Sequence, residues 1–318
     1  MPGLLALLAL VLGVSFASDA VAAAPAAAPE HAARIEARFD ADAFVIGASG
    51  INTWITRSAA IVSAYYGRFP IPVLRLKIVA APGAGIRTGH AYPGSGPGIE
   101  ITVGKDTTAA ALEHDWVLVH EFIHLALPEL AERHNWLAEG LATYVEGMAR
   151  VGAGNMTAEE LWQEYVDSMP KGEPTAGDAG LDRRPTWART YWGGALFSLN
   201  ADVEIRAATA NRNGLRDALR AILAASGGMR VEWPIERVLA VGDAATGTTV
   251  LAARYALERD RAVTTDLSAL WSRLGIEVVA GELRLDSATP AAALRLSLTA
   301  AEVAPAPPPV ELIEASAP

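Results

Sequence analysis

The chain has 318 residues, a formal net charge of −10 at pH 7 and no cysteine. The negative charge disfavours nucleic acids and anionic membrane surfaces as partners, and the lack of cysteine excludes disulfide bonds and a cysteine-linked lipid anchor. The length suits one domain made of two lobes, without accessory domains.

The N-terminus has the composition of an export signal. Residues 3–16 form an apolar run of Leu, Ala and Val, and small residues follow it. We predict that residues 1–24 are a signal peptide and that the mature chain is periplasmic or secreted, with no stable insertion into a membrane. An uncleaved N-terminal anchor is the alternative, because no Lys or Arg precedes the apolar run.

Three elements are predicted before residue 105. Residues 51–66 place apolar side chains at intervals of three to four, which predicts a helix, whereas Val73–Val79 and Gly98–Gly104 alternate as half-buried strands do. We therefore expect a mixed β-sheet in the first part of the domain.

The segment His120-Glu121-Phe122-Ile123-His124 is an H-E-x-x-H motif, predicted to lie on a helix that begins at an Asp106 N-cap and ends near Pro128. Residues i and i+4 share a helix face, so both imidazoles can bind one Zn²⁺. Glu121 points elsewhere on the helix and is the expected general base, acting on a water beside the metal.

A hydrolytic zinc site usually has a third protein ligand. We choose Glu139, which lies fifteen residues after His124 in a second periodic stretch, Trp136 to Met148. Asp115 and Glu132 are weaker alternatives. Glu146 returns to the helix face of Glu139 and is predicted to accept a hydrogen bond from the far nitrogen of a ligating histidine.

The combination of H-E-x-x-H with Trp136-Leu137-Ala138-Glu139-Gly140 resembles the glutamate-type zincins (gluzincins, peptidase MA-like), in particular the M1 and M61 aminopeptidase families. The resemblance implies an α+β, thermolysin-like fold, in which an N-terminal mixed β-sheet lobe carries the H-E-x-x-H helix and a mainly helical C-terminal lobe follows. It also implies that Tyr191 donates a hydrogen bond to the oxyanion. The chain departs from M1 enzymes by lacking the G-A-M-E-N signature.

The strand Gly98–Gly104 stands nearest to the place of that missing signature. An extended peptide could pair with an edge strand by β-augmentation. Glu100 could then hold a free α-amino group of the substrate, although a solvent-facing role for Glu100 is the favoured alternative.

The C-terminal part is predicted to be helical from Ala158 to Arg273, with a hairpin over Ile276–Asp286 and a strand over Leu294–Leu298. The catalytic domain should span residues 30–300. Residues 301–318 are rich in Ala and Pro, and we expect a disordered tail from Ala304 to Pro318.

These observations predict an exported zinc metallopeptidase that acts on peptides or proteins. Whether it is an aminopeptidase or an endopeptidase, and its oligomeric state, stay open. The main alternative is a non-catalytic binding or assembly factor of the cell envelope that keeps zinc as a structural element. A coincidental motif without metal is a third reading.

Overall fold

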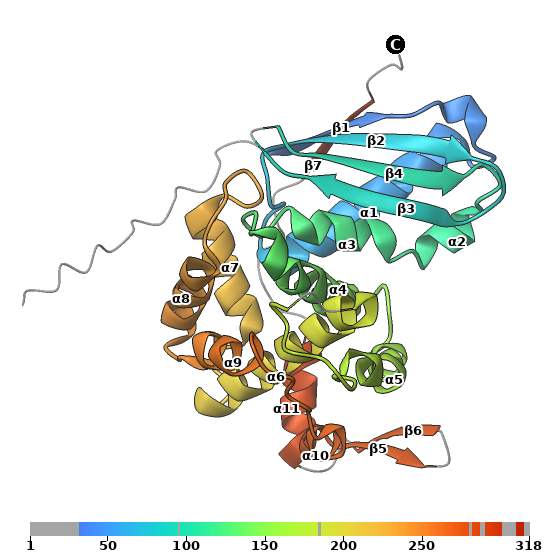
Figure 1. Ribbon diagram of the computed structural model, residues 1–318. Helices are drawn as coiled ribbons and strands as arrows, with labels where there is room; N and C mark the ends of the chain where they lie inside the picture. The colour runs from blue at the N-terminus through green and yellow to red at the C-terminus, as the bar shows by residue number, and fades with distance from the viewer. Residues whose placement is uncertain are drawn as a thin grey trace, which may run out of the picture.

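The computed structural model describes residues 32–94, 96–183, 186–279, 282–286, 290–300 and 310–314. A five-stranded sheet with the order β3-β4-β2-β1-β7 lies on one side of a larger group of helices (Figure 1). Its strands are β1 (Ala33–Arg38), β2 (Val73–Ala81), β3 (Ile86–Tyr92), β4 (Gly98–Gly104) and β7 (Val310–Glu314). The predicted signal peptide lies outside the described residues.

The sheet is mixed, as predicted. β7, β1, β2 and β4 run parallel to one another, and β3 pairs antiparallel with β4. The predicted alternation of β2 is confirmed, because Leu74, Leu76 and Ile78 are buried whereas Arg75 and Lys77 face solvent. The buried face packs on α1 (Gly47–Tyr66) and on the helix that carries the H-E-x-x-H motif (Figure 1).

The edge of the sheet is β3 and not β4. Gly98–Gly104 is a strand, but it lies between β2 and β3, so its backbone is already paired on both sides. The sequence of β3, Ile-Arg-Thr-Gly-His-Ala-Tyr, is mostly exposed and lacks a buried alternating face. A strand held chiefly by backbone pairing leaves no hydrophobic period in the sequence.

The H-E-x-x-H motif lies on a shorter helix than predicted. α2 (Ala109–Glu113) begins after an N-cap at Thr108, and a separate helix, α3 (Val117–His124), follows it. The Asp115 carboxylate accepts hydrogen bonds from the amides of Val117 and Leu118, each at 3.1 Å. The prediction of one helix capped by Asp106 is therefore wrong. The helix is interrupted at residues 114–116, and the Asp115 carboxylate binds the free backbone amides at the start of α3.

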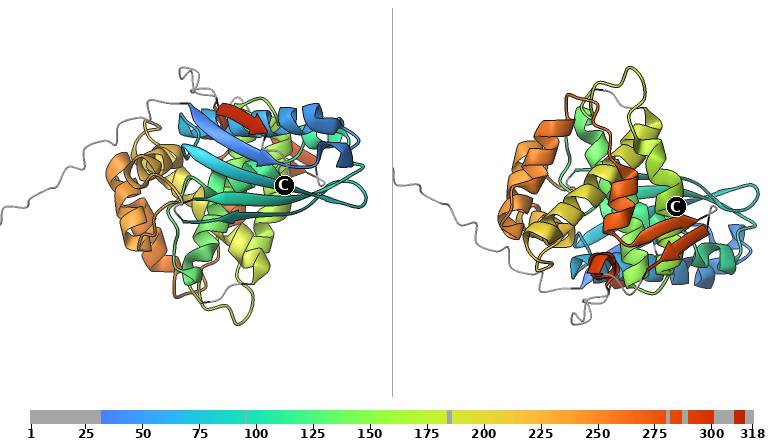
Figure 2. Two further views of the ribbon diagram at one scale, coloured as in Figure 1. Left: turned by 90° about the horizontal axis from the view of Figure 1, so that it is seen from above. Right: turned by 90° about the horizontal axis from the view of Figure 1, so that it is seen from below.

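After α3 the described chain to residue 273 consists of helices joined by loops, which confirms the helical prediction for Ala158 to Arg273. In the view from below in Figure 2, these helices lie in front of the sheet. They are α4 (Asn135–Gly152), α5 (Ala158–Ser168), α6 (Gly194–Ala208), α7 (Leu215–Ser226), α8 (Ile235–Thr246), α9 (Val250–Glu258) and α10 (Leu267–Arg273), with 3₁₀ turns at Ala41–Ala43, Glu132–His134 and Met169–Gly172 and a π-helix at Arg189–Gly193. No described helix combines the length and apolarity needed to span a membrane.

In the C-terminal part, the predicted hairpin is confirmed and the predicted strand is wrong. β5 (Ile276–Val279) and β6 (Glu282–Leu285) form the predicted hairpin, but the expected strand Leu294–Leu298 lies within a helix, α11 (Pro290–Thr299). Alanine and leucine are strong helix formers, and Leu294 and Leu298 share one helix face.

The predicted disordered tail is also wrong over residues 310–314, which form β7. This strand pairs in parallel with β1, with Val310 opposite Ala33 and Glu314 opposite Ala37. Without β7, the edge of β1 would present unpaired backbone N–H and C=O groups. A segment can form hydrogen bonds with these groups without having an apolar sequence. Residues 301–309 and 315–318 lie outside the described part.

Candidate metal centre

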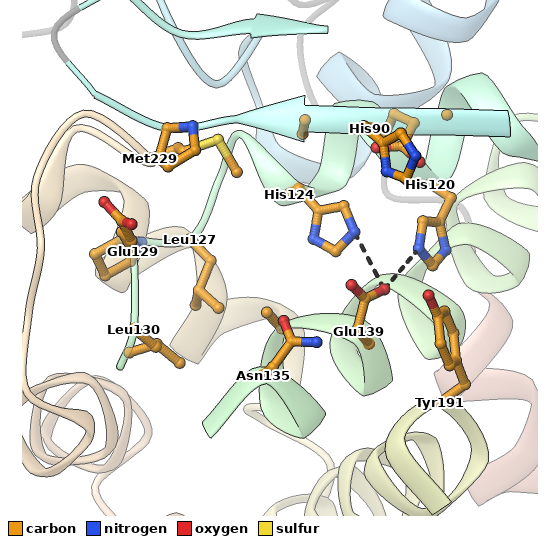
Figure 3. Close-up of a pocket in the computed structure, with 16 residues that line it drawn as sticks. His90, His120, His124, Leu127, Glu129, Leu130, Asn135, Glu139, Tyr191 and Met229 are labelled. Atoms are coloured by element: carbon orange, nitrogen blue, oxygen red, sulfur yellow. Dashed lines mark hydrogen bonds and ion pairs between the residues drawn. The ribbon is translucent and has the colours of Figure 1, made fainter. Parts of the chain in front are cut away.

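Two histidines from α3 and one glutamate from α4 meet beneath the edge strand β3 (Figure 3). The Glu139 Oε2 atom lies 3.3 Å from His120 Nε2 and 3.5 Å from His124 Nε2. The donor atoms of these three residues all lie within 4.8 Å of one another. The structure thus brings together the three residues chosen from the sequence as metal ligands.

The spacing of these donors suits a tetrahedral zinc ion. Two ligand atoms that each lie about 2.0–2.1 Å from such an ion are separated by about 3.4 Å. The two separations to Glu139 Oε2, 3.3 and 3.5 Å, match this value. Burial lowers the pKa of His120, which favours the neutral imidazole that binds metal. Burial acts the same way on His124, but the Glu139 carboxylate outweighs it and raises the pKa of His124, so a bound cation would have to displace that proton. The His₂Glu donor set therefore fits zinc in both chemistry and geometry.

Glu139 is held as a carboxylate. Burial alone would raise its pKa, but the hydrogen bonds and charges of His120 and His124 hold the pKa well below its usual range. An ionised oxygen donor between two imidazoles is what a divalent cation requires.

Glu121 lies between α3 and the edge strand. The Ala91 amide of β3 lies beside its carboxylate and favours the ionised form. Gly89 of β3 leaves room for this carboxylate, because a Cβ atom on Gly89 would lie 2.7 Å from Glu121 Oε1. Burial raises the pKa of Glu121, which suits a group that must accept a proton. Glu121 therefore faces the cavity beside the ligands without being one of them.

Tyr191 faces the same cavity from the π-helix Arg189–Gly193 (Figure 3). Its ring lies roughly parallel to that of His120, with ring centroids 6.2 Å apart. Burial and the neighbouring Glu139 carboxylate raise the pKa of Tyr191 to about 12. The phenol is therefore protonated at neutral pH and can donate a hydrogen bond.

Two glycines bring the Tyr191 segment against α4. A Cβ atom on Gly140 would lie 2.2 Å from Gly194 Cα, and one on Gly194 would lie 2.1 Å from the Trp136 carbonyl oxygen. The backbones of α4 and α6 touch at this crossing, one residue after Glu139 and three residues after Tyr191. Only glycine permits such a close approach.

The predicted partner role of Glu146 is not observed among the described contacts. Glu146 is buried on α4, where its Oε2 atom lies 3.4 Å from Arg150 Nη1. The Nδ1 atom of His120 is buried and has no hydrogen-bond partner within the described part of the chain. Glu146 does line a cavity together with His120, so a hydrogen bond between them remains a prediction.

The other candidate residues lie away from the ligands. Glu100 of β4 forms an ion pair with Lys77 on the outer face of the sheet, at 2.8 Å, and lines neither cavity described below. Asp115 caps α3, and Glu132 is exposed in a 3₁₀ turn. The sequence analysis did not identify Gly89 as part of the site. The glycine in Gly89-His90-Ala91, upstream of the motif, was the feature that could have indicated it.

Two cavities flank the ligands. The first, of about 290 Å³, extends past His124 towards Leu127, Asn135 and Met229 (Figure 3). The second, of about 360 Å³, extends the other way towards Trp116, Thr143 and Trp187. Both are lined by Gly89, His120, Glu121 and Tyr191. The candidate catalytic residues thus form the wall that the two cavities share.

The fold occurs in a solved structure of an aminopeptidase N family protein. An aminopeptidase N family protein from Idiomarina loihiensis aligns with a TM-score of 0.53 and 12% identity, over 72% of this chain and 45% of that chain. An M1 zinc metallopeptidase from Deinococcus radiodurans aligns with a TM-score of 0.42 and 17% identity, over 66% of this chain and 44% of that chain. The first likeness shows a shared fold.

The present chain spans less than half the length of either structure. No protein-family model matches the sequence, and no curated protein matches it. The likeness therefore concerns the fold, and the chemistry must be argued from the site.

Proposed function

We propose that this protein is an exported zinc-dependent peptidase that hydrolyses peptide bonds with Glu121 as general base. The single observation that carries the proposal is the convergence of a His₂Glu donor set, a buried carboxylate and a protonated phenol on one cavity wall. A purely structural zinc site has four protein ligands and is closed. Here three donors border an open cavity, which favours a catalytic role.

His120, His124 and Glu139 would hold the zinc ion. When bound, zinc acts as a Lewis acid that lowers the pKa of water and polarises a carbonyl group. The fold supports this assignment, because it resembles that of an aminopeptidase N family protein. In the proposed two-lobe zincin architecture, the sheet with α3 forms one lobe and the later helices form the other.

Glu121 moves the proton in the proposed reaction. Its carboxylate accepts a proton from the attacking water and then delivers that proton to the nitrogen of the leaving amine. The carboxylate lies against β3 at Gly89, next to the Ala91 amide, which places it beside the candidate ligands.

Tyr191 supplies a hydrogen bond to the oxygen of the scissile carbonyl. Negative charge develops on that oxygen in the transition state, and a neutral donor placed beforehand stabilises it. The raised pKa of Tyr191, about 12, keeps the phenol protonated throughout the physiological range.

The test is hydrolysis of a mixed peptide library by the purified mature chain and by Glu121→Gln, with zinc content measured on both. We expect Glu121→Gln to keep zinc and to lose turnover by about 10²–10⁴-fold, since the amide does not accept the proton. Tyr191→Phe should keep zinc with kcat lowered by about 10²-fold or more. Turnover by Glu121→Gln at the wild-type rate would contradict the mechanism.

A further inference from the structure

The second of the two cavities has an aromatic wall that begins at the candidate site. Trp116, Trp187 and Trp192 line it, together with His120 and Tyr191. The ring centroid of Trp187 lies 4.9 Å from that of Tyr191, and the ring centroid of Trp116 lies 5.7 Å from that of His120. A side chain bound against this wall therefore belongs to a substrate residue next to the scissile bond.

Two of these tryptophans are open to solvent. Trp187 is 70% exposed and Trp116 is 49% exposed, and they are the only exposed ones among the eight tryptophans of the chain, all of which the structure describes. The face of an indole ring attracts ammonium and guanidinium groups more strongly than other aromatic rings do. Its apolar surface also packs on the aliphatic stem of a long cationic side chain. The exposed indoles therefore favour a cationic ligand group.

Two carboxyl groups line the same cavity in addition to the candidate base. They belong to Glu146 of α4 and Glu164 of α5. Glu146 is paired with Arg150, whereas Glu164 forms no hydrogen bond or salt bridge within the described part of the chain. Burial raises the pKa of the Glu164 carboxyl, so a positive charge placed beside it would stabilise its ionised form. Glu164 is therefore the carboxylate available to a ligand.

The basic side chains near this cavity are bound to other groups. Arg87 lines the cavity, but its guanidinium donates a hydrogen bond to the Pro82 carbonyl oxygen, at 3.0 Å. Arg150 and Lys171 also lower the pKa of the α5 carboxyl, but neither lines the cavity, and the Lys171 Nζ atom lies 3.0 Å from Ser168 Oγ. The cavity thus has a free carboxylate without a free cation. The net charge of −10 also attracts cationic polypeptides to the protein.

We propose that the second cavity binds a lysine or arginine side chain of the substrate next to the scissile bond, with Glu164 as its ionic partner and the indoles of Trp116 and Trp187 as its walls. This inference rests on the peptidase function proposed above and names the substrate class of the same site, which is polypeptides with a basic residue beside the cut bond. The cavity volume of about 360 Å³ lies within the range of ligand pockets.

The test uses peptides that differ in one charge. A peptide that the protein cleaves is taken from the library above, and the residue on each side of its cut bond is replaced in turn by lysine, arginine or norleucine. Norleucine has a straight aliphatic side chain like that of lysine but lacks the ammonium group. Each peptide is made with a free and with an acetylated N-terminus. On one side of the bond, we expect kcat/KM for lysine or arginine to exceed that for norleucine by about 10-fold or more.

Two variants assign this preference to the cavity. Glu164→Gln should bring the ratio of kcat/KM for lysine over norleucine to within about threefold of one, and Trp187→Leu should lower the ratio by about 2–5-fold. The matched control is Glu159→Gln, which removes the same charge from an exposed position of α5 and should keep the wild-type ratio. Because each ratio is measured within one variant, a partial loss of folded protein cancels. A ratio near one in wild type, or a wild-type ratio in Glu164→Gln, would overturn the inference and leave the peptidase function intact.

Binding of the same peptides to zinc-loaded Glu121→Gln, measured by calorimetry, separates the two proposals. The lysine peptide should have a Kd about 10-fold or more below that of the norleucine peptide, and adding Glu164→Gln should remove this difference. If that result came without any cleavage dependent on Glu121, it would support the basic pocket and contradict the peptidase function. A preference for the free over the acetylated N-terminus that Glu164→Gln abolishes, with no preference for basic residues, would show that Glu164 binds a terminal ammonium group and would overturn the inference.

Discussion

The carboxylate of Glu121 is fixed from two directions. α3 carries it beside His120, and β3 contacts it through the amide of Ala91 and the open side of Gly89. In the proposed mechanism, these neighbours limit the orientations of the carboxylate while it accepts and delivers a proton. Under the proposed mechanism, the absence of a side chain on residue 89 is therefore part of the catalytic geometry.

Gly89→Ala tests this role. The added Cβ atom would lie 2.7 Å from Glu121 Oε1, so the carboxylate must move. We expect unchanged zinc content and a fall in kcat of about 10–100-fold, because a displacement near 1 Å is enough for such a loss. In Glu121→Gln the same substitution should add little, since the group that it displaces no longer acts as a base. Equal losses in both backgrounds would contradict the role.

Glu146 gives a prediction for stability against pH. Burial raises its pKa to about 8, from an ordinary value of 4.5. The folded state then binds more protons than the unfolded state between these two values. The contribution of Glu146 to stability is full below about pH 4.5 and is lost as pH rises through about 8.

Melting temperatures of wild type and Glu146→Gln, measured without metal between pH 5 and 9, test this expectation. Wild type should lose stability relative to the variant as the pH rises, because ionising a buried carboxyl is costly even beside Arg150. Parallel curves for the two proteins would show that Glu146 is ionised throughout the range.

The candidate ligands, the candidate base and the tyrosine could be chosen from the sequence, whereas their neighbours could not. His120, Glu121 and His124 lie on one helix, and their relation follows from helix geometry alone. Gly89 meets Glu121 through a contact between β3 and α3, and Arg150 reaches Glu146 in a buried environment. Contacts of this kind produce no periodic pattern of apolar residues in the sequence.

At the level of elements, the site depends on the crossing of α4 and α6. Glu139 lies on α4, and Tyr191 lies on the π-helix that leads into α6. Gly140 and Gly194 allow the two backbones to touch, which sets the separation between the ligand and the tyrosine. The motif Glu139-Gly140 thus contains one candidate metal ligand and one residue that permits close packing.

Gly140→Ala should disrupt this crossing. Its Cβ atom would lie 2.2 Å from Gly194 Cα, where no flexible side chain can yield. We expect a loss of about 3 kcal/mol or more in the free energy of unfolding, together with reduced activity. The matched control is Gly152→Ala on the same helix, where the new Cβ atom meets no atom within 4 Å. Alanine there should be neutral or slightly stabilising. Equal stability of the two variants would refute the close crossing.

The break between α2 and α3 shows why element boundaries were predicted less well than the elements themselves. Leu112, Trp116 and Val119 keep a helical spacing across the break, so hydrophobic periodicity favours one continuous helix. The structure ends α2 at Glu113 and begins α3 at Val117. The Asp115 carboxylate also accepts a hydrogen bond from the Trp54 indole on α1, at 3.0 Å. A tertiary contact of this kind selects the boundary.

Across the whole molecule, the sheet joins the two ends of the described chain. β7 from the C-terminal end pairs with β1 from the N-terminal end, at the edge opposite β3 (Figure 1). The side chain of Glu314 also contacts Asn52 of α1. A segment that composition alone describes as a tail therefore completes the sheet.

Deletion of residues 310–318 tests the role of β7. It would expose the edge of β1 and remove five residues of parallel pairing. We expect a lower melting temperature, by several degrees, measured by calorimetry. Peptidase activity below the transition should persist, because β7 and the candidate site lie at opposite edges of the sheet. Deletion of residues 315–318 keeps β7 and serves as the control. An unchanged melting temperature on removal of β7 would contradict its role.

The measurement that tests the central claim most directly is a calorimetric titration of zinc into the metal-free chain, beside Glu139→Ala and Glu121→Gln. The account predicts one tightly bound equivalent in wild type and in Glu121→Gln, and a large loss of affinity in Glu139→Ala, because Glu139 is the third donor. Zinc affinity that is absent from wild type, or unchanged in Glu139→Ala, would contradict the assignment of the site.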